Sequence, residues 1–254
     1  MNTKNDYIGL FDSGVGGISV LRHMLRLMPD ERYLYMGDSA NAPYGTKTKE
    51  QVRQLSFAVA EKLIARGIKA LVVACNTATS AAINDLRSAY PDLIVVGIEP
   101  ALKLAADRFP KGNLGVMATP MTLREEKFDL LLHRFDSQCR VSKIPAPGLV
   151  ELIEQGRGNS AEAEILLRSL LKDYIGNIDA LVLGCTHYPF AAEAISRVLG
   201  EQVALLDGGD GTARETKRRL ALAGLLNDGC GEIVIENSST DPKIIELAYR
   251  LLNE

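Results

Sequence analysis

Two segments of this chain have nearly the same pattern, although they begin 110 positions apart, at residues 68 and 178. Residues 68–77 read IKALVVACNT and residues 178–187 read IDALVLGCTH. In each, an apolar run of strand length ends in a small residue, followed by a cysteine and by residues that can cap a helix. The repeat therefore predicts two related halves, each with one thiol at the end of a buried strand.

The rest of the chain alternates short apolar runs with segments of helical periodicity, the pattern of an α/β protein with mostly parallel strands. A second echo relates residues 7–13 to residues 113–119, so that each half opens with a strand ending in a hydroxyl residue, Ser13 or Thr119. We therefore expect two similar α/β lobes related by pseudo-twofold symmetry, with the active site in the cleft between them. Strands are predicted at 7–11, 33–36, 70–74, 93–97, 114–117, 140–144, 180–184, 203–206 and 232–236.

The same pattern suggests where the lobes begin and end. We expect domain 1 to span residues 1–98 and domain 2 residues 99–207, with residues 208–254 crossing back to complete domain 1. Helices are predicted at 212–226 and 241–252 within this last segment. Two capping boxes, at 48–51 and 122–125, mark further helix starts.

Composition limits the function. Of the 254 residues, 46% are apolar and 24% charged, and a net charge of −3 gives no reason to expect nucleic acid or an anionic membrane as partner. The apolar runs are far shorter than the roughly 18 residues of a membrane span, and no signal-peptide core precedes the first strand, so we expect a cytoplasmic protein. The four cysteines form no CxxC pair and are expected to be thiols.

The matched cysteines, Cys75 and Cys185, carry the main chemical hypothesis. Both are expected just past the carboxyl end of a strand, where open α/β sheets bind ligands, and just before a helix whose N-terminus stabilises a thiolate. A lone buried cysteine is as readily a small hydrophobic residue. A matched pair is better explained by two thiols that face one cleft, one taking a proton from a carbon and the other returning a proton on the opposite side.

The glycine-rich stretch Asp12–Gly17 follows the first strand and can present backbone N–H groups to an anion. Ser19 stands where a dinucleotide fingerprint needs glycine, so a small carboxylate is the better guest, and a tight turn is the structural alternative. A carboxylate at Asp12 would repel such a ligand unless it handles a proton or binds a substrate ammonium.

His187 follows Cys185 by two positions. A Cys-x-His pair can hold a metal, but further ligands are missing nearby, so a proton-handling partner for the thiol is the better hypothesis and no metal is expected. In the segment 37–45, Tyr44 and Gly45 lie either near the ligand, in a loop that covers the cleft, or in a plain surface turn. Neutral donors are expected at strand ends from Asn76, Thr77, Thr119, Thr122 and Thr186.

Four motifs in this order resemble the glutamate racemase family of the aspartate/glutamate racemase superfamily. They are FDSGVGG (11–17), GDSANAPYG (37–45), ACNTAT (74–79) and GCTHYP (184–189). The likeness covers nearly the whole chain, and the four motifs together are highly specific.

The resemblance implies a cofactor-independent enzyme that interconverts L- and D-glutamate and supplies D-glutamate for peptidoglycan. It implies that Cys75 acts on the D-enantiomer and Cys185 on the L-enantiomer, with Asp12 and His187 as auxiliary acid–base groups. It also implies two lobes that enclose the substrate and a homodimer. The substrate-binding positions that it implies are Asp12, Ser13, Tyr44, Gly45, Asn76, Thr77, Thr119, Thr186 and His187.

Two stretches depart from the family pattern. Asn41 stands where arginine is usual, and residues 235–241 read IENSSTD where a Thr-Thr-Gly-Asp stretch is more typical.

Other diacid enzymes of the superfamily, such as an aspartate racemase or a maleate isomerase, remain alternatives. So does a non-catalytic binding protein that inhibits DNA gyrase, although retention of both cysteines and both proton-handling neighbours argues against it.

Overall fold

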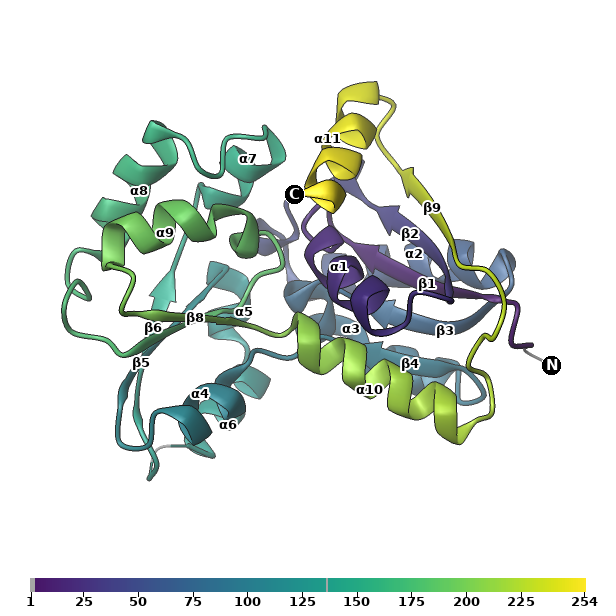
Figure 1. Cartoon of the computed structure of the whole chain (residues 1–254), viewed down its shortest axis with the longest axis horizontal. Helices are drawn as coiled ribbons and strands as arrows, with labels where there is room; N and C mark the ends of the chain where they lie inside the picture. The colour runs from purple at the N-terminus through teal and green to yellow at the C-terminus, as the bar shows by residue number, and fades with distance from the viewer. Residues whose placement is uncertain (1–2, 136) are drawn as a thin grey trace. The chain divides into compact units, whose positions relative to one another are not determined.

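The chain forms two compact units, each containing one parallel β-sheet flanked by helices (Figure 1). The computed structural model describes residues 3–135 and 137–254. Unit 1 comprises residues 1–99 and 209–254, and unit 2 comprises residues 100–208. The predicted α/β class with parallel strands is confirmed. Within the described ranges, no helix has the length and apolar character needed to cross a membrane.

Unit 1 is built around a sheet with the strand order β4-β3-β1-β2-β9, in which all described neighbours are parallel. Its elements are β1 (Tyr7–Asp12), α1 (Ile18–Leu27), β2 (Arg32–Gly37), η1 (Ser39–Asn41), η2 (Tyr44–Thr46), α2 (Lys49–Ala65), β3 (Ile68–Val73), α3 (Asn76–Ala89), β4 (Ile94–Gly97), α10 (Gly209–Leu222), β9 (Glu232–Asn237) and α11 (Pro242–Asn253). In Figure 1, α1, α10 and α11 cover one face of this sheet, whereas α2 and α3 cover the other. The sheet is therefore buried on both sides, which explains the nearly unbroken apolar runs of β1 and β3.

Unit 2 has a sheet with the order β6-β5-β7-β8, again parallel throughout its described part. Its elements are α4 (Leu102–Arg108), β5 (Asn113–Ala118), α5 (Pro120–Arg124), α6 (Glu126–His133), β6 (Arg140–Pro145), α7 (Leu149–Glu154), α8 (Ala161–Leu171), β7 (Ala180–Leu183), η3 (Tyr188–Ala191), α9 (Ala192–Leu199) and β8 (Ala204–Asp207). Helices α4, α5 and α6 lie on one face of the sheet, and α7, α8 and α9 lie on the other (Figure 1).

Parallel pairing brings the carboxyl ends of neighbouring strands to the same edge of each sheet. In unit 1, Asp12 pairs with Gly37, which in turn pairs with Asn237. The Ala74 N–H donates to the Phe11 carbonyl at 2.9 Å and continues the β1–β3 pairing toward the first cysteine. Segments far apart in the sequence therefore meet where the strands end.

The structure confirms one predicted capping box and contradicts the other. At the start of α2, the Thr48 hydroxyl accepts from the Gln51 N–H, while the Gln51 side chain accepts from the Thr48 N–H. Thr122 does not cap a helix. It lies inside the short helix α5, whose N-cap is Thr119, because Pro120 starts that helix three residues earlier than the capping-box pattern suggested.

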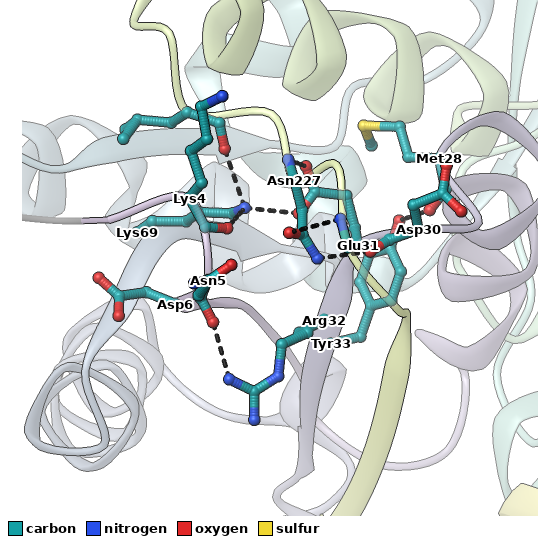
Figure 2. A network of polar contacts seen from close by, with 12 residues as sticks. Lys4, Asn5, Asp6, Met28, Asp30, Glu31, Arg32, Tyr33, Lys69 and Asn227 are labelled. Carbon is teal, nitrogen blue, oxygen red and sulfur yellow. Dashed lines mark hydrogen bonds and ion pairs between the residues drawn. The ribbon is translucent and has the colours of Figure 1, made fainter.

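A buried ion pair fastens unit 1 at the amino-terminal end of its sheet (Figure 2). The Lys69 side chain is fully buried, and its Nζ donates to Glu31 Oε2 (2.5 Å), to the Lys4 carbonyl (2.5 Å) and to the Leu225 carbonyl (2.9 Å). The other Glu31 carboxylate oxygen accepts from the backbone N–H of Asn227 at 2.9 Å. Because the ammonium has three acceptors, the N-terminal segment, β2, β3 and the loop before β9 are held at one point.

We predict that Lys69→Met lowers the free energy of unfolding by about 3–5 kcal/mol, since it leaves the Glu31 carboxylate buried without its cation. Lys69→Met combined with Glu31→Gln should recover part of the loss, because the remaining charge is then removed. Urea denaturation measures both changes.

The matched control is Lys4→Met, which removes the solvent-exposed ion pair between Lys4 and Asp228 and should cost less than about 1 kcal/mol. Equal stability of Lys69→Met and Lys4→Met would contradict the assigned role of the buried pair.

Candidate active site

In unit 1, Cys75 lies just past the end of β3 and is the N-cap of α3. Its side chain is buried, and its Sγ accepts a hydrogen bond from the Ala78 N–H at 3.4 Å. The thiol also lies 3.8 Å from Ser13 Oγ, to which it donates. A helix N-terminus directed at the sulfur favours negative charge there, which suits a thiolate base.

Asp12 ends β1 at the same edge of the sheet and is fully buried. Its Oδ1 accepts from the Gly14 N–H at 3.0 Å. A Cβ on Gly17 would lie 2.8 Å from Asp12 Cβ and 3.1 Å from Ala74 Cβ, so glycine is required for the loop to close over both. The Tyr35 hydroxyl fixes the loop further by donating to the Gly14 carbonyl at 2.7 Å. The glycine-rich stretch is thus a tight turn that holds Asp12 next to the residue preceding Cys75.

Tyr44 and Gly45 lie in η2 and are buried, so the segment 37–45 is not a plain surface turn. The Tyr44 hydroxyl donates to Asp38 Oδ2 at 2.7 Å. Burial, this hydrogen bond and the negative charges of Asp38, Cys75 and Asp12 raise the pKa of Tyr44 well above its usual value. Tyr44 thus shares the electrostatic environment of Cys75 and Asp12.

Asn76 and Thr77 form the first turn of α3 and are buried directly after Cys75. Within the described part of the chain, Asn76 Oδ1 is a buried oxygen with no hydrogen-bond partner. An unsatisfied buried acceptor is costly, so a ligand that brings an N–H donor to it would be stabilised.

In unit 2, Cys185 follows β7 and is buried beside a histidine and a glutamate. Cys185 Sγ lies 3.7 Å from His187 Nδ1, and His187 Nε2 lies 2.6 Å from Glu154 Oε1. Glu154 ends α7 and is about one-sixth exposed, with a side-chain exposure of 17%. Sequence reasoning missed Glu154 because it stands 33 positions before His187, and no local pattern connects the two.

The environment of His187 favours its charged form. Burial alone would lower the pKa of the imidazole, but hydrogen bonds to Cys185 and Glu154 and the charges of these two groups outweigh it and hold that pKa well above the usual value. A protonated imidazole donates from one ring nitrogen toward the sulfur and from the other to the carboxylate. His187 can therefore hold a proton beside the second thiol.

The two thiols differ in their local structure more than the sequence repeat suggests. Cys185 does not lie directly before an α-helix, because Pro189 has no N–H to donate to the Cys185 carbonyl: the short 3-10 helix η3 begins at Tyr188, and α9 starts only at Ala192. The expectation of a helix immediately after Cys185 is wrong. The sulfur of Cys185 therefore has His187, bound to Glu154, as its polar neighbour, whereas the sulfur of Cys75 has the first turn of α3.

The predicted threonines of unit 2 lie at the same sheet edge as Cys185. Thr119 follows β5, the neighbour of β7, and Thr186 follows Cys185, and both are buried. Thr119 Oγ1 and Thr122 Oγ1 are 2.9 Å apart and share a hydrogen bond. These hydroxyl groups can donate to an anion without adding charge.

The predicted site residues thus form two groups. Asp12, Ser13, Tyr44, Gly45, Cys75, Asn76 and Thr77 gather in unit 1, and Thr119, Cys185, Thr186 and His187 gather in unit 2 with Glu154. Over residues 3–135 and 137–254, no cluster of three or more His, Cys, Asp or Glu side chains is placed to hold a metal ion. All four cysteines lie in these ranges and are free thiols.

Comparison with known proteins identifies the family. Residues 8–216 match the family model described as Asp/Glu/Hydantoin racemase. The chain belongs to the Asp/Glu/Hydantoin racemase family. It is 49% identical over 255 residues to a glutamate racemase of Clostridium botulinum, with 99% of each chain covered.

Solved structures of other members have the same fold. Glutamate racemase isoform RacE1 from Bacillus anthracis is 32% identical, with a TM-score of 0.89 over 99% of this chain and 95% of that chain. Glutamate racemase from Francisella tularensis, solved in complex with D-glutamate, is 28% identical, with a TM-score of 0.86 over 99% and 95% of the two chains. These proteins share both the sequence pattern and the two-lobe architecture of this member of the Asp/Glu/Hydantoin racemase family.

We predict that Glu154→Gln lowers the pKa of His187, because it removes the carboxylate that favours the imidazolium while keeping the size of the side chain. A pH titration of the imidazole nitrogens by NMR measures the shift, with His23 and His133 as internal references. Glu151→Gln removes the same charge one turn earlier in α7 and serves as the control. An unchanged His187 titration in Glu154→Gln would show that the carboxylate does not stabilise the imidazolium.

Proposed function

We propose that this protein interconverts L- and D-glutamate by proton transfer at Cα, using its own cysteines in place of a cofactor. The observation that carries the proposal is that each unit holds one buried thiol beside its own acid–base group. Cys75 and Asp12 lie at the carboxyl ends of two neighbouring strands, and Cys185 contacts His187, which is bound to Glu154. The similarity to glutamate racemases supports glutamate as the substrate.

The proposed reaction needs two thiols in opposite protonation states. One cysteine, as thiolate, removes the Cα hydrogen as a proton, and the electron pair of the C–H bond remains on Cα. The other cysteine, as thiol, gives its proton to the opposite face of that carbon. The configuration is inverted, the first sulfur is now protonated and the second is the thiolate. Cys75 acts on the D-enantiomer and Cys185 on the L-enantiomer, assisted by Asp12 and His187 respectively.

Substrate binding is assigned to groups that leave the charge of the two thiols undisturbed. The Asn76 Oδ1 acceptor suits an N–H of the substrate ammonium, since it is buried without a partner in the described chain. Neutral hydroxyls suit the two carboxylates. We propose the hydroxyl groups of Ser13, Thr77, Thr119 and Thr186 as these donors. Tyr44 and Gly45 are assigned to the same binding site.

Three further features complete the proposal. The enzyme works in the cytoplasm, as a homodimer, and supplies D-glutamate for peptidoglycan. The composition and charge of the chain, together with the resemblance to glutamate racemases, support these assignments. Neither a metal nor pyridoxal phosphate takes part, because the two thiols supply both bases.

We predict that the pure protein racemises L-glutamate without any added cofactor, and that EDTA dialysis and hydroxylamine treatment leave the rate unchanged. Circular dichroism follows the loss of optical activity of L-glutamate, and the same assay is run with L-aspartate. Isomerisation of maleate is followed separately by its absorbance. Faster turnover of aspartate or maleate would identify another diacid enzyme. Gyrase inhibition without turnover would identify a binding protein, and activity restored only by metal or pyridoxal phosphate would refute cofactor independence.

We predict that Cys75→Ala and Cys185→Ala each abolish racemisation, while each still eliminates chloride from one enantiomer of a β-chloro analogue. Elimination needs only one base, because the Cα electron pair expels chloride once the proton has been removed. Cys75→Ala should process the L-form and Cys185→Ala the D-form, as followed by chloride release.

Cys139→Ala is the matched control, since Cys139 is also a buried thiol but donates to the Phe135 carbonyl of its own unit. It should racemise glutamate at about the wild-type rate. If both single variants eliminate from the same enantiomer, or if either one racemises normally, the two-thiol mechanism is wrong.

A further inference from the structure

The segment between β2 and α2 contains a buried carboxylate that the proposed chemistry does not use. Asp38 is only 2% exposed. Its oxygens accept from the Asn41 side-chain amide at 3.0 and 3.1 Å and from the Tyr44 hydroxyl at 2.7 Å. In the part of the chain that the structure describes, no lysine or arginine pairs with it. A buried carboxylate therefore depends on two neutral donors from its own loop.

The contact with Asp38 defines the role of the Tyr44 hydroxyl. This hydroxyl is bound to Asp38, and the Tyr44 side chain is 1% exposed. The hydroxyl therefore holds in place the segment that contains Tyr44 and Gly45, the two residues to which the proposed function assigns substrate binding.

The end of β9 is bound to the same loop from another part of the chain. The Ala40 N–H donates to Ser238 Oγ at 3.0 Å, and the Asn237 amide donates to Ser39 Oγ at 2.9 Å. The Ser238 N–H donates to the Gly37 carbonyl at 2.8 Å. These contacts join two regions that are almost 200 positions apart, and both contain departures from the family pattern.

Gly37 makes this close approach possible. A Cβ at this position would lie 2.5 Å from the Asn237 side-chain nitrogen and 2.6 Å from the Gly14 carbonyl oxygen. The following N–H, that of Asp38, donates to the Asp12 carbonyl at 2.9 Å. The loop is thus held by β1 at its start, by β9 along η1, and by Asp38 at Tyr44.

A segment held in this way loses little conformational freedom when a ligand binds, which raises affinity without altering the chemical step. We propose that Asp38 is a positioning residue for substrate binding, which acts through Tyr44, and that Asn237 and Ser238 at the end of β9 reinforce the same loop. The inference rests on the proposed function, in which Tyr44 and Gly45 bind glutamate.

The first experiment separates binding from chemistry. Asp38→Asn and Tyr44→Phe should each raise KM for D-glutamate about ten-fold while kcat stays within about two-fold of wild type, since each weakens one hydrogen bond to a charged group. The double variant should have the KM of the more affected single variant, because Asp38 acts through Tyr44. A fall in kcat at unchanged KM, or multiplicative effects in the double variant, would overturn the proposal.

The second experiment changes a residue that is not buried, and it measures the loop first in the ligand-free protein and then through KM. Ser238→Ala removes the acceptor of the Ala40 N–H, so amide hydrogen exchange over residues 39–46 should become several-fold faster in the ligand-free protein. KM should rise about three-fold. Ser88→Ala is the matched control, because this exposed serine donates to the Asn84 carbonyl within α3 and should alter neither quantity.

The outcomes distinguish the two proposals. If the wild-type protein does not racemise glutamate, the proposed function fails, and the exchange measurement still decides whether β9 fastens the loop. If racemisation is normal and Ser238→Ala changes neither exchange nor KM, the positioning role of β9 is refuted while the proposed function stands.

Discussion

Hydrogen bonding between parallel strands determines where the reactive groups of each unit lie. In unit 1, the register places Asp12 beside Gly37 and Gly37 beside Asn237, while Cys75 follows the strand on the other side of β1. A shift by one residue in any of these pairings would separate these residues from their partners and turn each of their side chains to the opposite face of the sheet. The register of the strands therefore fixes where a carboxylate, a thiol and the loop that contains Tyr44 lie at the carboxyl end of this sheet.

The two thiols come from a repeated sequence but lie in different electrostatic surroundings. The sulfur of Cys75 accepts from a backbone N–H at the start of α3. The sulfur of Cys185 has a side-chain neighbour, His187, whose charge is favoured by Glu154. The N–H that donates to Cys75 does not titrate, whereas the imidazole that contacts Cys185 can gain or lose a proton. This difference provides a physical reason for the two directions of a proton-transfer reaction to respond differently to pH and to mutation.

Much of the fold could be predicted from local sequence, because buried strands need continuous apolar runs and helices need caps. The boundaries of β3 and β7 agree with the predicted strands to within two residues, and Thr48 caps α2 as expected. Local rules fail where contacts are made by distant residues. Glu154 and Ser238 carry no sequence signal that links them to His187 and Ala40, since only the assembled sheets bring them together. The α-helix expected directly after Cys185 does not form there for a local reason, which is that Pro189 has no backbone N–H to donate.

The discontinuity of unit 1 has a consequence for the synthesis of the protein. Unit 2 is continuous over residues 100–208, but unit 1 needs residues 209–254 to supply β9 and the Leu225 carbonyl that binds Lys69. The chain leaves the ribosome from its amino terminus, so residues 100–208 can fold while the Lys69 ammonium still lacks one acceptor and β2 still lacks β9 on one side. We therefore expect a nascent chain whose residue 208 has just left the ribosome to hold Cys185 in a completed unit, whereas the unit that positions Cys75 still lacks β9, α10 and α11.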